Sequence, residues 1–134
     1  MKRTIEELLE TPYWIIDILP MQVPKDSGGQ YFAIEDYYLD EVRSRDIKKK
    51  HIGLILKINC YRDLSFDDED RINPAPEEIA LAMEKRYLNI RIGGSLIVSK
   101  PDDTYLTLYD PDEELLELVK MIAAAEGLFV WKPK

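Results

Sequence analysis

The sequence predicts an α+β fold: a mostly antiparallel or mixed sheet with about three helices packed on it. Strand-like segments outnumber long amphipathic ones, and several of them follow one another through tight turns. Strands joined in this way pair antiparallel. The 134 residues show no internal repeat and no Ser/Gly-rich linker, so we expect a single α+β domain over residues 1–134.

The N-terminal segment predicts a short helix followed by a strand. Thr4 and Glu7 have the spacing of a capping box, and Pro12 prevents the helix from continuing. Residues 13–19 then form a strand-like segment that is largely apolar on both faces. Because such strands are typical of the middle of a layered structure, we expect this one to be covered on both sides.

The middle of the chain predicts a helix, a strand and a second helix. Residues 31–47 carry apolar side chains at helical spacing, with acidic residues before basic ones; a strand at the start of this segment is the alternative. Residues 52–61 are rich in isoleucine and leucine and predict a strand. The polar segment 64–76 predicts a loop, and residues 77–86 predict a helix.

The last third of the chain predicts a meander, a helix and a short strand. Residues 88–109 contain three strand-like segments, and the Gly-Gly pair at 93–94 predicts the first hairpin turn. We expect Asp110 to cap the final helix, because a proline and three acidic residues follow it. Gly127 is expected to end that helix, and residues 128–131 predict the last strand.

Charge and composition narrow the class of protein. The chain has 18 basic and 26 acidic residues, a net charge of −8, which repels a phosphate backbone, so we expect no binding to nucleic acid. No apolar stretch approaches the ~18 residues of a membrane span, and the first ten residues lack the apolar region of a secretory signal. Cys60 is the only cysteine, so no internal disulfide forms. These features predict a cytoplasmic protein without a membrane partner.

The residue types that carry catalysis are sparse. The single histidine, His51, and the single cysteine, Cys60, lie at opposite ends of the predicted strand, too far apart for a dyad. We expect His51 at the surface and Cys60 as a buried side chain. The acidic run 67–70 lacks the spacing of a calcium-binding loop, which favours a solvated loop; a weak Mg²⁺ or Ca²⁺ site is the alternative. We predict no cofactor, no metal centre and no specific catalytic residue.

Asp17 and an aromatic cluster are the best candidates for a binding site. A buried carboxylate is costly unless it is paired or hydrogen-bonded, so we expect Asp17 near the sheet edge or paired with Arg62 or Arg91. In a functional site it would converge with Glu35 for acid–base chemistry. The aromatic residues between 31 and 38 cannot all face one core. The candidate binding residues are Asp17, Tyr31, Phe32, Glu35, Tyr37 and Tyr38.

These features favour a non-catalytic protein-interaction or regulatory module, for example an immunity-like protein that neutralises a basic partner. The alternatives are a small carboxylate-based enzyme, with or without Mg²⁺, and a small-molecule binder with a pocket between sheet and helix. The basic cluster 43–50 predicts a solvated helix terminus, with docking of an acidic partner as the alternative. The sequence leaves the oligomeric state open.

Overall fold

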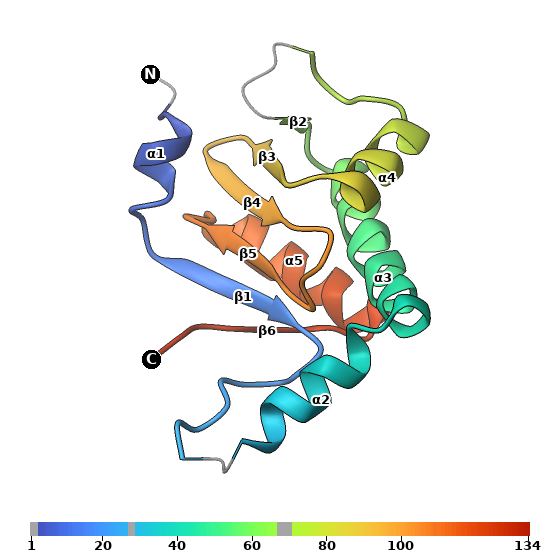
Figure 1. The fold of residues 1–134 in the computed structure, drawn as a ribbon. Coiled ribbons are helices and arrows are strands. Elements are labelled where there is room, and N and C mark those ends of the chain that lie inside the picture. Colours follow the sequence, from blue (N-terminus) through green and yellow to red (C-terminus); the bar gives the residue numbers. More distant parts are fainter. Residues whose placement is uncertain (1–2, 27–28, 67–70) are drawn as a thin grey trace.

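An open six-stranded sheet forms the centre of the structure, a computed structural model that describes residues 3–26, 29–66 and 71–134 (Figure 1). The strand order is β2-β3-β4-β5-β1-β6, and every neighbouring pair is antiparallel. Along the chain the elements are α1 (Ile5–Leu8), β1 (Tyr13–Asp17), α2 (Gln30–Tyr38), α3 (Glu41–Asn59), β2 (Ser65–Phe66), α4 (Pro76–Lys85), β3 (Leu88–Ile92), β4 (Ser95–Ser99), β5 (Leu106–Tyr109), α5 (Glu113–Glu126) and β6 (Phe129–Trp131). The α+β class is confirmed, with five helices in the described residues instead of about three.

Helices α3, α4 and α5 lie together on one face of the sheet, and this layer holds the main hydrophobic core (Figure 1). Because side chains alternate along a strand, every second residue of β1 and β5 points into this core. Ile16, Leu106 and Leu108 are examples, and all three are fully buried. The burial of this one face therefore fixes the register of the sheet.

The opposite face of the sheet is covered only in part. The short helix α1 packs Leu8 against Leu96 and Val98 of β4, and no other helix in the described residues belongs to this small cluster. Strand β1 lies between β5 and β6, and its residue Tyr13 is 40% exposed on this side. The strand ends at Asp17 instead of residue 19, and the expected cover on both sides holds at Ile15 and Asp17, which are buried, but fails at Tyr13.

Residues 52–59 are helical and residues 60–61 form the turn that ends the helix, which contradicts the strand predicted over 52–61. They continue α3, and their buried side chains recur every three or four residues, as on one face of a helix. The buried residues of α3 are Ile47, Lys48, His51, Ile52, Leu54, Ile55 and Ile58. Isoleucine has a local preference for strands, but burial of this stripe against the sheet and α5 outweighs that preference.

The helical conformation also reverses the predictions for His51 and Cys60. His51 is fully buried on the inner side of α3, whereas it was expected at the surface. Cys60 caps the exposed end of the same helix, and its thiol points to the carbonyl of Leu56 at 3.7 Å instead of entering the core. The prediction of a surface histidine and a buried cysteine is wrong because both rested on a strand at 52–61.

A side-chain cap divides the predicted helix 31–47 into two helices. Asp40 adopts an extended backbone, and its Oδ1 accepts hydrogen bonds from the backbone N–H groups of Val42 and Arg43 at 3.0 and 2.8 Å. This is the geometry of an N-cap, which starts a new helix. The aromatic helix α2 is thereby separated from α3 and is free to take its own direction, as Figure 1 shows.

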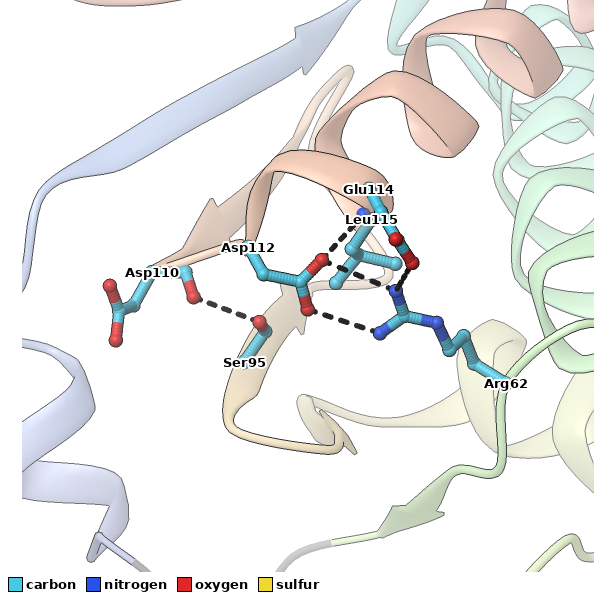
Figure 2. A network of polar contacts seen from close by, with 6 residues as sticks. All are labelled: Arg62, Ser95, Asp110, Asp112, Glu114 and Leu115. Carbon is cyan, nitrogen blue, oxygen red and sulfur yellow. Dashed lines mark hydrogen bonds and ion pairs between the residues drawn. The ribbon is translucent and has the colours of Figure 1, made fainter.

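Helix α5 is capped by Asp112, not by Asp110 as predicted. Asp112 Oδ1 accepts a hydrogen bond from the backbone N–H of Leu115 at 2.8 Å. The same carboxylate accepts hydrogen bonds from the two terminal guanidinium nitrogens of Arg62, each at 3.2 Å (Figure 2). Asp110 instead turns the chain with a φ of 50°, and its carbonyl accepts the hydroxyl of Ser95. Both aspartates suit a helix start, so local sequence alone does not choose between them.

Most of the remaining elements agree with the predictions. Thr4 and Glu7 form the capping box of α1, and Pro76 occupies the first turn of α4. The segment 88–109 is the meander β3-β4-β5, and Gly127 ends α5 with a left-handed φ of 82° before β6. The predicted loop before α4 contains the two-residue strand β2. Within the described residues, no helix combines the length and apolar character needed to cross a bilayer.

Candidate functional site

The uncovered face of the sheet carries three cavities that share walls. We call them the α2 cavity, the central cavity and the β5 cavity, with volumes of about 320, 270 and 310 Å³. The α2 and central cavities share Asp17, Gln22, Tyr31 and Trp131. The central and β5 cavities share Tyr13, Ile15 and Tyr105. The open face, as we use the term, is this continuous surface over β6, β1, β5 and β4.

The open face is formed by the strand residues that point away from the core. Tyr13, Ile15 and Asp17 alternate with the core residues of β1, and Ile15 lies opposite Trp131 of β6 and Thr107 of β5. The rings of Tyr13 and Tyr109 lie 5.5 Å apart between centroids. Tyrosine and tryptophan bury large rings while keeping a polar atom accessible, which makes them common binding residues.

Asp17 is the most unusual group of the open face. Its side chain is only 7% exposed, yet it lines both the α2 cavity and the central cavity. Its Oδ1 accepts the backbone N–H of Ile18 at 2.7 Å, and no ion pair joins it to a cation among the described residues. Burial raises the pKa of Asp17 above its usual range, and backbone hydrogen bonds offset only part of this rise. The molecule therefore holds a carboxylate with unused acceptor capacity at the floor of two cavities.

Tyr31 connects Asp17 to a second carboxylate. Its hydroxyl donates to Glu35 Oε2 at 3.1 Å, one turn further along α2, and its ring lines both cavities that contain Asp17. Burial raises the pKa of Tyr31 to about 12, and the charges of Glu35 and Asp17 contribute to that rise. The same two carboxylates help to raise the pKa of Tyr105 on the other side of the central cavity. The electrostatic field at this end of the open face is thus negative.

Trp131 and the C-terminal residues form the wall on the β6 side. The indole Nε1 of Trp131 is buried and completes no hydrogen bond of ordinary geometry with the described residues, although it lies near enough to Asp17 to lower the pKa of that carboxyl slightly. Gln22 Oε1 accepts the backbone N–H of Lys134 at 2.8 Å. This bond ties the end of the chain to the loop after β1, and Pro133 lies between them at the rim of the central cavity.

The structure brings together some of the predicted binding residues. Asp17, Tyr31 and Phe32 line the α2 cavity, and Glu35 joins them through the Tyr31 hydroxyl. Phe32 is 67% exposed, and no residue of α2 is buried, so this helix presents its aromatic side chains to the surroundings. Asp17 and Glu35, which were expected to converge in a functional site, interact electrostatically, and no hydrogen bond joins them in the described part of the chain.

Tyr37 and Tyr38 lie outside these cavities. Their rings pack edge to face at 5.3 Å, and the guanidinium of Arg43 lies 3.7 Å above the ring of Tyr37. The predictions missed Tyr105 and Trp131, which line the central cavity. Alternation along the strands is the signal that groups Trp131 with Tyr13 and Asp17, but it requires the strand order, which the sequence does not provide.

Another cavity is lined by charged residues that already pair with one another. It measures about 540 Å³ and lies beside the hairpin of β3 and β4. Its charged lining residues include Arg3 and Asp110, which pair at 2.7 Å, and Asp112, which holds Arg62 (Figure 2). These groups already have opposite charges next to them, so they fasten α1 and α5 to the sheet instead of facing a ligand.

Several residues of the predicted basic cluster 43–50 make contacts within the molecule. Arg43 pairs with Asp40, and Arg45 pairs with Glu41 at 3.3 Å. Lys48 is only 7% exposed and donates to the carbonyl of Lys100 at 3.0 Å. The prediction of a solvated helix terminus is wrong, because these residues lie within the first half of α3, which continues to Asn59. Their internal contacts also give no support to a docking surface for an acidic partner.

His51 and the acidic groups give no metal site in the described residues. Lys48 Nζ lies 3.5 Å from His51 Nδ1, and burial together with this positive charge lowers the pKa of His51 to about 3. The histidine is therefore neutral and sealed in the core. No group of three or more His, Cys, Asp or Glu residues within the described part of the chain has the arrangement of a metal site. The acidic run 67–70 lies outside the described residues.

Comparison of the chain with protein-family models, with curated proteins and with solved structures gave no match. The function is therefore argued from the geometry and chemistry of the open face.

Proposed function

We propose that the protein is a non-catalytic interaction module whose open face binds a basic segment of a partner protein. One observation carries this proposal: the nearly buried carboxylate of Asp17, which forms no ion pair among the described residues, opens into cavities lined by tyrosine and tryptophan, with the exposed Lys25 on the α2 cavity. A buried charge in this state is costly for the isolated protein. A cationic side chain supplied by a partner relieves that cost.

The charge of the whole molecule supports the same choice of partner. The net charge of −8 attracts a basic protein at long range and speeds the encounter. At the open face, Asp17 and Glu35 concentrate negative charge near α2, and Asp103 adds a carboxylate in the β5 cavity next to Lys100. An extended basic segment that crosses the face from α2 to β5 meets aromatic rings along its whole path.

The direct test is to measure the affinity of the protein for an octapeptide of alternating arginine and alanine, with alternating glutamate and alanine as the reverse-charge peptide. Calorimetry at low and high salt is suitable, because binding between exposed charges weakens as salt rises. We expect the basic peptide to bind and the acidic peptide not to bind. Equal heats for the two peptides, or none for the basic one, would overturn the proposal.

Two variants with the same change of charge locate the binding surface. Thr107→Lys adds a positive charge in the middle of the open face, whereas Ala125→Lys adds one to the exposed surface of α5. We expect Thr107→Lys to weaken binding of the basic peptide at least about tenfold, which corresponds to about 1.4 kcal/mol. Ala125→Lys should change it less than about twofold, because its distance from the site leaves only a screened long-range effect. Equal losses would mean that net charge alone attracts the peptide.

A carboxylate-based enzyme is the second candidate, favoured because Tyr31 bonds to Glu35 and also feels the charge of Asp17. In its Mg²⁺-dependent form, the ion would bind to these two carboxylates. Millimolar Mg²⁺ is then expected to raise the melting temperature of the wild type and to leave that of Asp17→Asn unchanged. An unchanged melting temperature of the wild type contradicts the Mg²⁺-dependent form.

A further inference from the structure

We infer that the central cavity receives one arginine side chain of the partner, with its guanidinium on the carboxylate of Asp17 and its plane against the surrounding rings. The inference rests on the proposed function and adds the residue that the partner must supply. In this inference Asp17 anchors the arginine of the partner. The walls of the cavity, formed by Tyr31, Tyr105 and Trp131, determine the shape of the side chain that fits.

The acceptors at the floor of the cavity suit a cation with several donors. Asp17 accepts the backbone N–H of Ile18 on Oδ1 and lies near the backbone N–H of Leu19 and the indole of Trp131, so its roughly four lone-pair positions leave room for a further donor. The hydroxyl of Tyr31 gives its hydrogen to Glu35, so its oxygen remains an acceptor toward the cavity that its side chain lines. A guanidinium has five N–H donors in a planar fork and can bond to both of these residues at once.

The walls of the cavity favour the same group. Tyr13, Tyr31, Tyr105 and Trp131 line it, together with Ile15 and Pro133. A guanidinium stacks on aromatic rings and is more weakly hydrated than an ammonium, so it enters such a place with a smaller loss of hydration. The volume of about 270 Å³ lies just below the range of about 300–1,000 Å³ typical of small-molecule pockets, which favours a single side chain over a larger ligand.

The probe for this inference is Nα-acetyl-arginine methylamide, which presents one arginine side chain without a peptide. Its neutral analogue of the same shape contains citrulline, and its flexible analogue contains lysine. The reporter is the indole N–H signal of Trp131 in a nitrogen-15 NMR spectrum. Trp14→Phe removes the only other indole, since Trp14 packs against the core on the opposite face.

We expect the arginine compound to shift the Trp131 signal in a saturable way, the lysine compound to bind more weakly, and the citrulline compound not to bind. Asp17→Asn keeps the shape of the side chain and removes its charge, and should weaken the arginine compound about tenfold or more. Glu117→Gln is the matched control, because it removes an exposed carboxylate from α5 on the other side of the sheet, and should change the affinity less than about twofold.

The inference is overturned if citrulline binds as well as arginine, if Glu117→Gln weakens binding as much as Asp17→Asn, or if the arginine compound leaves the Trp131 signal in place. Binding of the basic octapeptide distinguishes failure of this inference from failure of the proposed function. If the basic octapeptide is blocked by Thr107→Lys but not by Asp17→Asn, the open face binds a basic segment and the arginine pocket is wrong. If the octapeptide does not bind, or binds equally well to Thr107→Lys, the proposed function itself is wrong.

Discussion

The two faces of the sheet are made from the same strands but carry different kinds of side chain. On the helix side, neighbouring residues such as Ile16 and Leu108 are fully buried among other apolar side chains. On the open face, Tyr13 and Asp17 alternate with them. Tyr13 is an exposed ring, and Asp17 is a buried carboxylate that forms no ion pair among the described residues. The apolar side chains of the helix side stabilise the fold. The open face carries a carboxylate that does not contribute to the hydrophobic core. We take this difference as the reason to place the binding site on the open face.

The largest expected effect is a difference in stability between substitutions on the two faces of the sheet. Leu108 and Thr107 are adjacent in β5 and point to opposite sides of the sheet. Leu108→Ala should lower the free energy of unfolding by about 2–5 kcal/mol, because it leaves a cavity in the core. Thr107→Ala should lower it by less than about 1 kcal/mol. Urea denaturation of the two variants measures both values, and similar losses would show that the open face also supports the fold.

The buried histidine should make the helix side sensitive to acid. The pKa of His51 is lowered to about 3 in the folded protein, so below its ordinary value of 6.5 the unfolded chain binds the proton more strongly. Stability should fall as the pH decreases from about 6.5 to about 3, with each pKa unit worth about 1.4 kcal/mol. Denaturation midpoints across this range test the prediction. In His51→Leu the pH dependence in this window should be smaller, and an unchanged slope would contradict the assignment to His51.

Neutralising Asp17 should not lower the stability of the fold, although it should weaken binding. Burial raises its pKa in the folded protein, so the ionised form is disfavoured and stability is lost as the pH rises above the ordinary value near 3.8. Asp17→Asn should therefore leave the free energy of unfolding unchanged or raise it by about 1 kcal/mol at pH 7, while binding falls. Urea denaturation at pH 7 provides the value. A loss of more than about 1 kcal/mol would mean that the carboxylate is structural.

The smallest expected effects concern the exposed network at the start of α5. Asp112→Ala removes an N-cap as well as the partner of Arg62 and should cost about 1 kcal/mol (Figure 2). Arg62→Ala leaves the cap in place and should cost less than about 1 kcal/mol, because this pair is exposed to solvent. Thermal melting compares the two variants. A larger loss for Arg62→Ala would show that the ion pair, not the cap, fixes the helix start.

Some of the fold follows from the sequence because its signals are local. The capping box at Thr4, the Gly-Gly turn at 93–94 and the glycine at 127 each determine a turn or a helix end through their own chemistry. Residues 52–61 were not predictable in this way. Their isoleucines suit a strand locally, and only the packing of α3 against the sheet and α5 makes the helix the better solution.

The candidate site was predictable in part for the same reason. Asp17 stands out in the sequence as a charge in an apolar strand, and Tyr31 belongs to a visible aromatic cluster. Tyr105 and Trp131 carry no such local signal. They reach Asp17 only because β1 pairs with both β5 and β6, which depends on contacts between segments more than eighty residues apart in the chain.

The central claim is that the open face, with Asp17 at its floor, is the surface that binds a basic segment. Backbone chemical-shift mapping with the octapeptide of alternating arginine and alanine tests it across the whole chain. We predict that the largest shifts fall on β1, β5, β6 and the start of α2, with the Trp131 indole among them. Shifts confined to the outer surfaces of α3, α4 and α5, or no shifts at all, would contradict the account.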